Sequence, residues 1–511
     1  MPDQFVACNA ALYPERTALD FQGGSLTFLA LERVIQKIAS VLIPLKTQAP
    51  RLVAIDFENY LHHWMIFLAL SRLSLTCCTL PPEAAGETKE ALEALAPDVI
   101  IGGKAIESAS QNFEYLTLGP EWFQQIFVAE PPAAINTLSQ PDFEISETSP
   151  FYVALAGASV GGFQPVILTR SKVREGGSRL LWMDAVMSET PVRPIFVSTV
   201  HPSMLTGFLS VCSALSSGAL VRFHNPANPA AAFAGKGPFL AILTPSHLAI
   251  VLDSIGPVRY ALPDISLVLG GGRASNRLLE RCYKSFTQNV RLVYATDETG
   301  PITMVSGSQR IAPEHAGPVM PWADVKILDE DGEPVPMGEM GEIWVRVDDG
   351  ISGYQTVNSV RGAYFGANAR YFQNGWFFTG DRGKLFFKNG IREIWLEGRA
   401  DDLVTLGGGK YDLAKIDAVL AEDPNVQDAG SFIYTDGEGR ERLSCAVVPK
   451  EGCELDFKSL SKRFHDLYPG LPPLPLFRTT RLPRDNFGMV ERHLLAAGIK
   501  GRIPEKLGGE A

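Results

Sequence analysis

Five short segments of the 511-residue chain contain glycines, carboxylates or hydroxyls at spacings that suit phosphate or metal chemistry. The first runs from Gly157 through Ser159 to Gly161, directly after the apolar run FYVALA. Glycines at a strand end let backbone N–H groups approach and hold an anion. The run lacks the Gly-Lys-Ser/Thr ending of a P-loop, so a plain tight turn is the alternative. The same two interpretations apply to a second glycine run: Gly270, Gly271 and Gly272.

Two further segments place carboxylates after apolar runs. Tyr294 is followed by Asp297 and Glu298, a carboxylate pair suited to Mg²⁺, which prefers oxygen ligands and often bridges to substrate phosphates. The alternative is a helix N-terminus whose dipole attracts both acidic side chains. Asp381 follows a Thr-Gly pair, where a carboxylate can accept two sugar hydroxyls or serve only as a turn residue.

The last segment, GRADDLVTLGGGK, begins at Gly398 and contains Arg399, Asp401 and Gly408. Its alternatives are a ligand-contacting loop and a charged linker. No single segment decides the function, because each is short enough to occur without a ligand.

Apolar runs alternate with helical periodicity along the N-terminal part of the chain, which predicts a doubly wound α/β fold with parallel sheets covered by helices. Thr27 is the expected N-cap of one helix, with apolar positions at Leu31, Val34, Ile35, Ile38 and Leu42. The predicted strands are 51–57, 75–80, 151–155, 194–199, 219–223, 239–243, 266–269 and 291–294.

Short alternating runs and glycine turns from about residue 320 to 398 predict a mostly antiparallel β subdomain. Beyond it, helices at 413–421 and 457–467 and a hairpin at 431–449 indicate a small α+β domain. We therefore expect an N-terminal domain at residues 1–398 and a mobile C-terminal domain at 402–511.

Composition excludes several classes of function. The formal charge is −11 without a basic block, which argues against a nucleic-acid surface. Seven scattered cysteines form neither a disulfide framework nor a CxxC pattern, and the eight histidines lack zinc-ligand spacing. The N-terminus does not read as a secretory signal, and polar residues interrupt the uncharged segment 194–221, so we expect a cytoplasmic protein without a membrane span.

The order and spacing of these segments resemble the adenylate-forming superfamily of acyl-CoA synthetases, nonribosomal-peptide adenylation domains and luciferases. The resemblance covers nearly the whole chain. The matching segments are YPERTALDFQGGSLTFLALERVIQKIASVL, LGGGRASNRLLERC, YATDET, GEPVPMGEMGEIWVRV, WFFTGD, GRADDLVTLGGGK and LPRDNFGMVER.

The resemblance implies two half-reactions: a carboxylate attacks the α-phosphate of ATP, and the acyl-adenylate then passes to the thiol of CoA or of a phosphopantetheine-bearing acyl or peptidyl carrier protein. It assigns Mg²⁺ to Glu298, beside Asp297, and the ribose of ATP or AMP to Asp381 and Arg399. By the same resemblance the remaining positions divide into an adenine slot (Tyr294 and Gly270 to Gly272), a phosphate loop (Gly157, Ser159 and Gly161), a hinge (Asp401) and a pantetheine-facing position (Gly408).

The sequence departs from the family pattern at the groups that act on phosphate. Gln164 stands where the phosphate loop of the family ends in lysine, and Met489 replaces the lysine of the closing motif. Asp297 replaces the usual threonine, which adds negative charge. Losing one preorganised donor typically lowers kcat by about 10²–10³. Lys410, Arg392 and Arg484 are candidate substitutes.

Two hypotheses follow. The first is a ligase that activates a non-amino aryl or alkyl carboxylic acid and transfers it to a thiol; the segment VHPSMLTGFL offers no aspartate to pair with a substrate ammonium. The second is a degenerate relative that has lost or rerouted adenylation and acts by binding a nucleotide, acyl thioester or partner, or by acyl transfer. In either case His201 has two interpretations, a packed loop histidine and a catalytic one.

Overall fold

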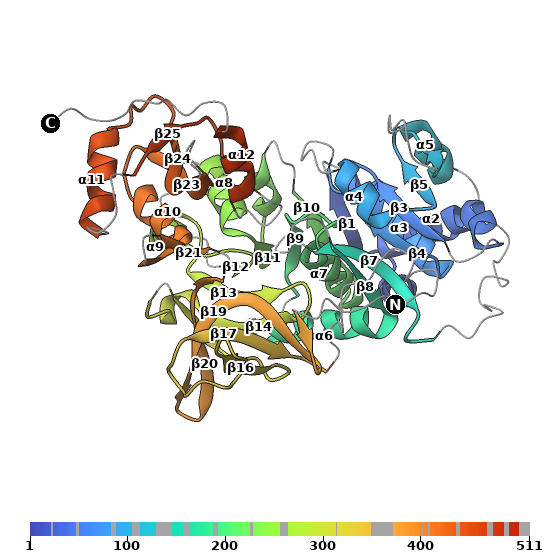
Figure 1. Ribbon diagram of the computed structural model, residues 1–511. Coiled ribbons are helices and arrows are strands. Elements are labelled where there is room, and N and C mark those ends of the chain that lie inside the picture. Colours follow the sequence, from blue (N-terminus) through green and yellow to red (C-terminus); the bar gives the residue numbers. More distant parts are fainter. Residues whose placement is uncertain are drawn as a thin grey trace. The chain divides into compact units, whose positions relative to one another are not determined.

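In the computed structural model the chain divides into two compact units, and each unit contains two stretches of the chain (Figure 1). Unit 1 comprises 1–325 and 344–378, and unit 2 comprises 326–343 and 379–511. The predicted boundary at 398–402 stays a prediction. The described residues are 1–21, 24–47, 51–82, 88–104, 113–128, 146–156, 164–187, 193–224, 228–255, 264–312, 314–348, 371–400, 402–406, 409–435, 440–467, 474–484 and 490–499.

An eight-stranded sheet forms one half of unit 1, in the order β14-β13-β12-β11-β9-β10-β1-β2. All neighbours from β13 to β1 run parallel, whereas β14 and β2 are antiparallel edge strands. The strands are β1 (Thr17–Phe21), β2 (Gly24–Thr27), β9 (Ile195–Ser198), β10 (Val221–Phe223), β11 (Phe239–Leu243), β12 (Ile265–Leu269), β13 (Asn289–Thr296) and β14 (Gly300–Ser306).

A six-stranded sheet forms the other half, in the order β6-β5-β3-β4-β7-β8, with only β7 and β8 antiparallel. Its strands are β3 (Leu52–Asp56), β4 (Thr76–Thr79), β5 (Val99–Gly102), β6 (Glu114–Thr117), β7 (Pro150–Ala156) and β8 (Gln164–Thr169). Both sheets confirm the predicted α/β fold, because parallel neighbours need the crossover helices that the periodicity predicted.

The helices of unit 1 are α1 (Pro2–Leu12), α2 (Phe28–Leu42), α3 (Tyr60–Arg72), α4 (Thr88–Leu95), α5 (Pro120–Val128), α6 (Arg170–Met187), α7 (Leu205–Ser216), α8 (Pro245–Ile255) and α9 (Asn276–Ser285), with short 3₁₀ helices at Ile43–Thr47, Pro229–Phe233 and Gly307–Gln309. The N-cap prediction for α2 is confirmed, since the Thr27 hydroxyl accepts the Ala30 N–H at 3.1 Å. None of the described helices is long and apolar enough to cross a membrane.

Helix α3 is buried on every side from His63 to Ser71, so it lies in the middle of the core. Its Phe67 packs edge-on against Tyr152 of β7 and Phe208 of α7, and the last two rings stack at 3.7 Å. The Tyr152 hydroxyl donates to the Pro202 carbonyl at 2.8 Å and lies 2.8 Å from the Thr79 hydroxyl. This bond fixes the loop after β9 against the six-stranded sheet.

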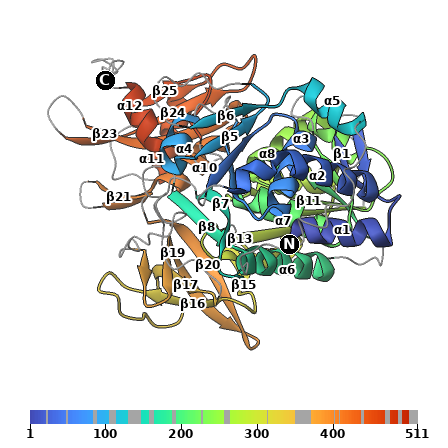
Figure 2. The ribbon, with the colours of Figure 1, turned by 90° about the vertical axis from the view of Figure 1, so that its right-hand side faces the viewer.

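The β-rich part forms a sheet in the order β15-β20-β19-β17-β16, with β18 beside β19. Figure 2 shows the long β19–β20 hairpin in orange. The strands are β15 (His315–Pro318), β16 (Asp324–Leu328), β17 (Gly341–Arg346), β18 (Phe372–Gln373), β19 (Trp376–Lys388) and β20 (Ile391–Arg399). The predicted antiparallel character is confirmed for β18–β19 and β19–β20.

The C-terminal part of unit 2 packs three helices around a three-stranded sheet (Figure 1). Its elements are β21 (Leu403–Leu406), β22 (Gly409–Asp412), α10 (Leu413–Ala421), β23 (Val426–Thr435), β24 (Glu441–Pro449), α11 (Phe457–Leu467), β25 (Leu476–Arg478) and α12 (Arg492–Ile499). Helices α10 and α11 have the predicted bounds.

A buried charge cluster holds α12 in place. The Arg492 guanidinium donates to Asp402 at 2.6 Å, to Asp417 of α10 at 2.8 Å and to the Ser431 carbonyl at 2.6 Å. Burial disfavours the charge of Arg492, but the two carboxylates outweigh burial and raise its pKa. Arg492 therefore joins the segment after Arg399 to α10, β23 and α12.

Replacing Arg492 with leucine should destabilise unit 2 by about 3–5 kcal/mol, because two buried carboxylates lose their counter-charge. Denaturant unfolding followed by fluorescence measures the change. Arg478→Leu, at an exposed position of β25, is the control and should change the free energy of unfolding by about 0.5 kcal/mol or less. Equal stability of the two variants would contradict a structural role for this cluster.

Candidate active site

The described site residues of unit 1 gather at the carboxyl ends of parallel strands. His201 follows β9, His224 follows β10, the Gly270–Gly272 turn follows β12, and Tyr294 to Glu298 close β13. Because parallel neighbours end at the same edge of a sheet, these segments share one edge. This is the edge at which open α/β sheets bind ligands.

The acidic turn lies between two antiparallel strands. β13 and β14 pair from Arg291↔Ser306 to Thr296↔Gly300, so Asp297, Glu298 and Thr299 form the connecting turn. The helix N-terminus considered for this segment is therefore wrong. Thr299 donates its N–H to the Thr296 hydroxyl at 3.2 Å, which stabilises the turn. The pairing also explains why a glycine follows the turn, since Gly300 has a φ of +70°.

Glu298 is 8% exposed and lies beside two buried or half-buried threonine hydroxyls, Thr296 and Thr299. These are hard oxygen donors, the kind that Mg²⁺ selects. Among the described residues no group of three His, Cys, Asp or Glu side chains could hold a metal. The turn therefore offers a magnesium ion one buried carboxylate rather than a full set of protein ligands, and Glu298 is the residue that would hold it.

Arg179 of α6 is a cation at this turn that sequence reasoning missed. Its guanidinium donates to the Thr299 carbonyl at 3.3 Å and lies 5.5 Å above the Trp322 ring. Residues 179 and 299 are 120 positions apart, and no motif links them. Arg179 adds positive charge next to Asp297 and Glu298.

The glycine turn Gly270–Gly272 joins β12 to α9. Gly270 donates its N–H to the Leu243 carbonyl at 3.1 Å, and Gly271 has a φ of +72°, where a side chain would be strained. Ser275 caps α9 by accepting the Leu278 N–H. Gly271 and Gly272 are exposed, so their backbone is open to a ligand.

In unit 2, Asp381 and Arg399 face each other across β19 and β20, with 3.6 Å between Oδ1 and Nη1. Arg399 also donates to the Thr379 carbonyl at 3.3 Å, and Asp381 donates its N–H to the Thr379 hydroxyl at 3.2 Å. A Cβ on Gly380 would lie 2.8 Å from Arg399 Nη2, and its φ is +77°. Any side chain at this position would be strained by the positive φ, so glycine suits the turn beside this carboxylate–guanidinium pair.

Several predicted positions lie outside the described residues: Gly157, Ser159, Gly161, Asp401, Gly408 and Met489. The ends of the first loop are described, because Ala156 of β7 pairs with Gln164 of β8. Of the candidate substitute cations, Arg484 forms an ion pair with Asp428. Arg392 stands opposite Phe387 in the β19–β20 hairpin.

Burial disfavours the charged form of the histidines at the sheet edge. Burial lowers the pKa of His201 to about 4, with a further effect from His224, and lowers the pKa of His224. His201 bonds Ser203 through Nδ1, so the packed-loop interpretation fits its contacts. Sequence reasoning overlooked His224, which has no motif and becomes a site residue only through the strand order.

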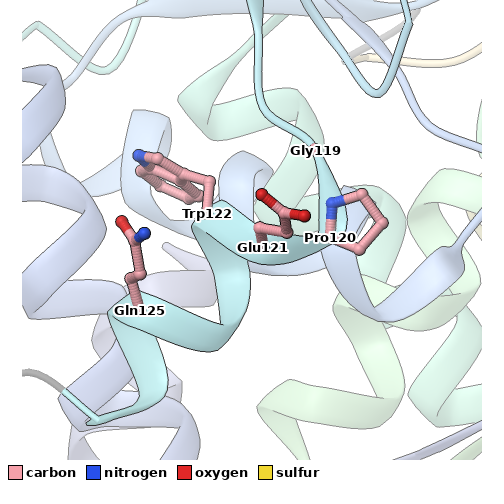
Figure 3. Close-up of a pocket in the computed structure, with 5 residues that line it drawn as sticks. All are labelled: Gly119, Pro120, Glu121, Trp122 and Gln125. Carbon is pink, nitrogen blue, oxygen red and sulfur yellow. The ribbon is translucent and has the colours of Figure 1, made fainter.

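A separate hollow of about 470 Å³ opens at the first turns of α5 (Figure 3). Its lining residues are Gly119, Pro120, Glu121, Trp122 and Gln125. It is wide open and built from one helix and the residue before it, with none of the predicted site residues. It therefore lacks the converging polar groups of a binding site.

Comparison with known proteins decides the family, since the model of the AMP-binding enzyme family matches residues 6–355. The chain belongs to the AMP-binding enzyme family. A probable CoA ligase of Humulus lupulus is 25% identical over 524 residues, 97% of this chain and 95% of the relative. An indoleacetate–CoA ligase of Aromatoleum aromaticum is 29% identical over 253 residues, 48% of this chain and 47% of the relative.

Solved structures share the fold of this AMP-binding enzyme. The o-succinylbenzoate CoA synthetase of Bacillus subtilis, in complex with its acyl-adenylate intermediate, superposes with a TM-score of 0.77 at 19% identity over 99% of both chains. The resemblance to adenylate-forming enzymes is thereby confirmed at the level of family and fold.

The buried histidines make the stability of unit 1 pH-dependent. Burial lowers the pKa of His63 from 6.5 to about 3, assisted by His201. Between pH 6.5 and 4 these histidines bind protons in the unfolded chain but not in the folded chain. The free energy of unfolding therefore falls as the pH falls through this window. His63→Gln should reduce the slope of the free energy of unfolding against pH by the contribution of about one proton, which is about 1.4 kcal/mol per pH unit.

Urea unfolding at a series of pH values measures this slope. His465→Gln, at an exposed position of α11, is the control and should keep the wild-type slope. His201→Gln is a second test of the same effect in case His63→Gln folds poorly. A wild-type slope in both buried variants would contradict the prediction.

Proposed function

We propose that this chain is an acid–thiol ligase that activates a non-amino aryl or alkyl carboxylic acid as its acyl-adenylate and transfers it to CoA or a carrier-protein thiol. The observation that carries the proposal is the Asp381–Arg399 pair, which the β19–β20 register and Gly380 hold in place for a ribose. The relatives named as CoA ligases support the same class of reaction.

The proposed chemistry has two steps. The substrate carboxylate attacks the α-phosphate of ATP and pyrophosphate leaves; the thiol then attacks the acyl carbon and AMP leaves. Asp381 accepts the ribose hydroxyls, and Arg399 keeps the carboxylate oriented. The exposed Gly271 and Gly272 backbone contacts the nucleoside together with Tyr294.

The acidic turn serves the phosphates in this proposal. Glu298 would hold Mg²⁺, which would neutralise phosphate charge. Thr296 and Thr299 fix the turn through their hydroxyls, which are 3.0 Å apart. Arg179 offsets part of the negative charge that Asp297 adds beside the triphosphate.

The sequence also supports a second candidate function. Gln164, the first residue of β8, is uncharged, whereas the family has a lysine at this position. With Met489 also uncharged, adenylation lacks two cations. The alternative is a member that binds a nucleotide or acyl thioester, or transfers an acyl group, without forming the adenylate itself. Pyrophosphate release with an acid favours the ligase, whereas binding without turnover favours the alternative.

Asp381→Asn should weaken AMP and Mg²⁺–ATP by the same factor, roughly tenfold or more, because both nucleotides carry the ribose that the carboxylate accepts. Calorimetric titration of the full chain measures both affinities. Asp324→Asn, in an exposed ion pair with Arg346, is the control and should bind as the wild type does. Unchanged affinity in Asp381→Asn would overturn the ribose role.

Met489→Lys, alone or with Gln164→Lys, should raise pyrophosphate release by a factor on the order of 10², since each lysine restores a cation for the developing charge. The substrates are ATP and a panel of aryl and alkyl acids. Gln309→Lys adds the same charge at an exposed position and should leave the rate unchanged. Unchanged release in both Met489 variants would contradict a weakened ligase and favour the alternative function.

A further inference from the structure

Two side chains from distant segments of unit 1 hold the end of the acidic turn where β14 begins. The Arg179 guanidinium of α6 donates to the Thr299 carbonyl at 3.3 Å and lies 5.5 Å from the centre of the Trp322 ring. Trp322 donates its Nε1–H to the Pro301 carbonyl at 2.8 Å. Arg179 and Trp322, called the turn clamp below, therefore bond the chain on both sides of Gly300.

The Arg179 side of the clamp is fixed by the packing of α6 against α7. The Gly177 carbonyl accepts the Ser213 hydroxyl at 3.1 Å, and a Cβ on Gly176 would lie 3.0 Å from the Cδ1 atom of Leu209. Two neighbouring residues without side chains thus let the helices lie close together just before Arg179. The position of Arg179 depends on this packing and not on the acidic turn.

The Trp322 side of the clamp is fixed to β14. Met320 donates its N–H to the Ile302 carbonyl at 2.8 Å, next to the Pro301 carbonyl that Trp322 bonds. The segment before β16 is therefore attached to two successive carbonyls of β14. Because a helix and a strand hold the two clamp residues, the clamp fixes the turn before a ligand arrives.

The clamp also brings positive charge to a turn that carries two carboxylates. Asp297 and Glu298 directly precede Thr299, and Glu298 is 8% exposed. Negative charges on adjacent residues oppose the approach of a triphosphate, and this repulsion grows where water is excluded. Arg179 is a cation bonded to this turn, so its charge acts against that of Asp297.

We propose that the turn clamp sets the affinity of the site for Mg²⁺–ATP, with the charge of Arg179 compensating the charge of Asp297. Arg179 and Trp322 are positioning residues, because they act through the Thr299 and Pro301 carbonyls. The compensation accounts for an aspartate at a position where a neutral residue would add no charge beside the phosphates. The inference rests on the proposed function, because it concerns the nucleotide site of the same enzyme.

Calorimetric titration of the full chain with Mg²⁺–ATP and separately with AMP tests the clamp. Arg179→Gln should weaken Mg²⁺–ATP roughly tenfold, because the charge of Asp297 is then uncompensated. The affinity for AMP should change by a factor of about two or less, since AMP carries a single phosphate. Arg179→Lys keeps the positive charge and should recover most of the lost affinity.

A double-mutant cycle separates charge compensation from a merely structural bond. Adding Asp297→Thr to Arg179→Gln should restore the affinity for Mg²⁺–ATP to within about threefold of the wild type, since it removes the charge that Arg179 offset. Loss of the bond to the Thr299 carbonyl cannot be rescued in this way. A double variant that binds Mg²⁺–ATP as weakly as Arg179→Gln would overturn the compensation.

Variants of the tryptophan test the positioning role independently, in case Arg179→Gln unfolds. Trp322→Leu removes the ring beside Arg179 and should weaken Mg²⁺–ATP about threefold, whereas Trp322→Phe keeps a ring and should lose less. The matched control is Arg346→Gln, because Arg346 lies 4.8 Å from the Trp376 ring at an exposed position. It should bind both nucleotides as the wild type does. Wild-type affinity in Trp322→Leu would contradict the positioning role.

The titration with AMP separates the possible failures. If AMP binds and the affinity for Mg²⁺–ATP is unchanged in Arg179→Gln, the clamp inference is overturned and the proposed function stands. If Arg179→Gln weakens both nucleotides by the same factor, the inference is also overturned, because the clamp then does not act on the phosphates. If the wild type binds neither nucleotide, the proposed function fails, and the inference fails with it.

Discussion

Parallel pairing of β10, β9, β11, β12 and β13 is the constraint on which the candidate site depends. Strands that pair in parallel end at one edge, so each loop that follows them is delivered to the same place. The glycine turn, the acidic turn and the two histidines come from four different loops. These residues lie at one edge only because the five strands run in the same direction and pair as neighbours.

The interior of unit 1 fixes one of these loops by hydrogen bonding as well as by packing. Tyr152 of β7 bonds the Pro202 carbonyl, next to His201, while its ring stacks on Phe208 of α7. A buried hydroxyl with satisfied partners holds a loop more tightly than apolar contact alone, because displacement would leave polar groups unpaired. Burial lowers the pKa of His201, so this loop offers a hydrogen bond, whereas the acidic turn at the same edge offers charge.

Unit 2 uses charge in two different ways. Asp381 and Arg399 form a partly exposed pair on a hairpin, available to a polar ligand. Arg492 instead lies in a buried network with Asp402 and Asp417, where every charge has a partner inside the protein. The first arrangement suits binding, and the second holds the segment after Arg399 to the core of the unit.

The sequence by itself determined the family, the alternation of strands and helices, and the bounds of elements such as α10 and α11. Local rules suffice there, since periodicity, N-caps and glycine turns act within a few residues. The resemblance also named Asp381, Arg399 and Glu298, because motif spacing reflects a shared backbone. For the turn after Thr296, local rules also allowed the start of a helix. Only the pairing of β13 with β14 shows that the segment is a hairpin turn.

Tertiary structure alone decided the partners of residues far apart in sequence. Arg179 meets Thr299 across 120 positions, and Tyr60, His201 and His224 meet through sheet order. No local pattern marks Arg179, Tyr60 or His224, because contacts between distant elements depend on how whole sheets and helices pack. The same packing sets the burial that lowers the histidine pKa values and so determines which hydrogen bonds the site can make.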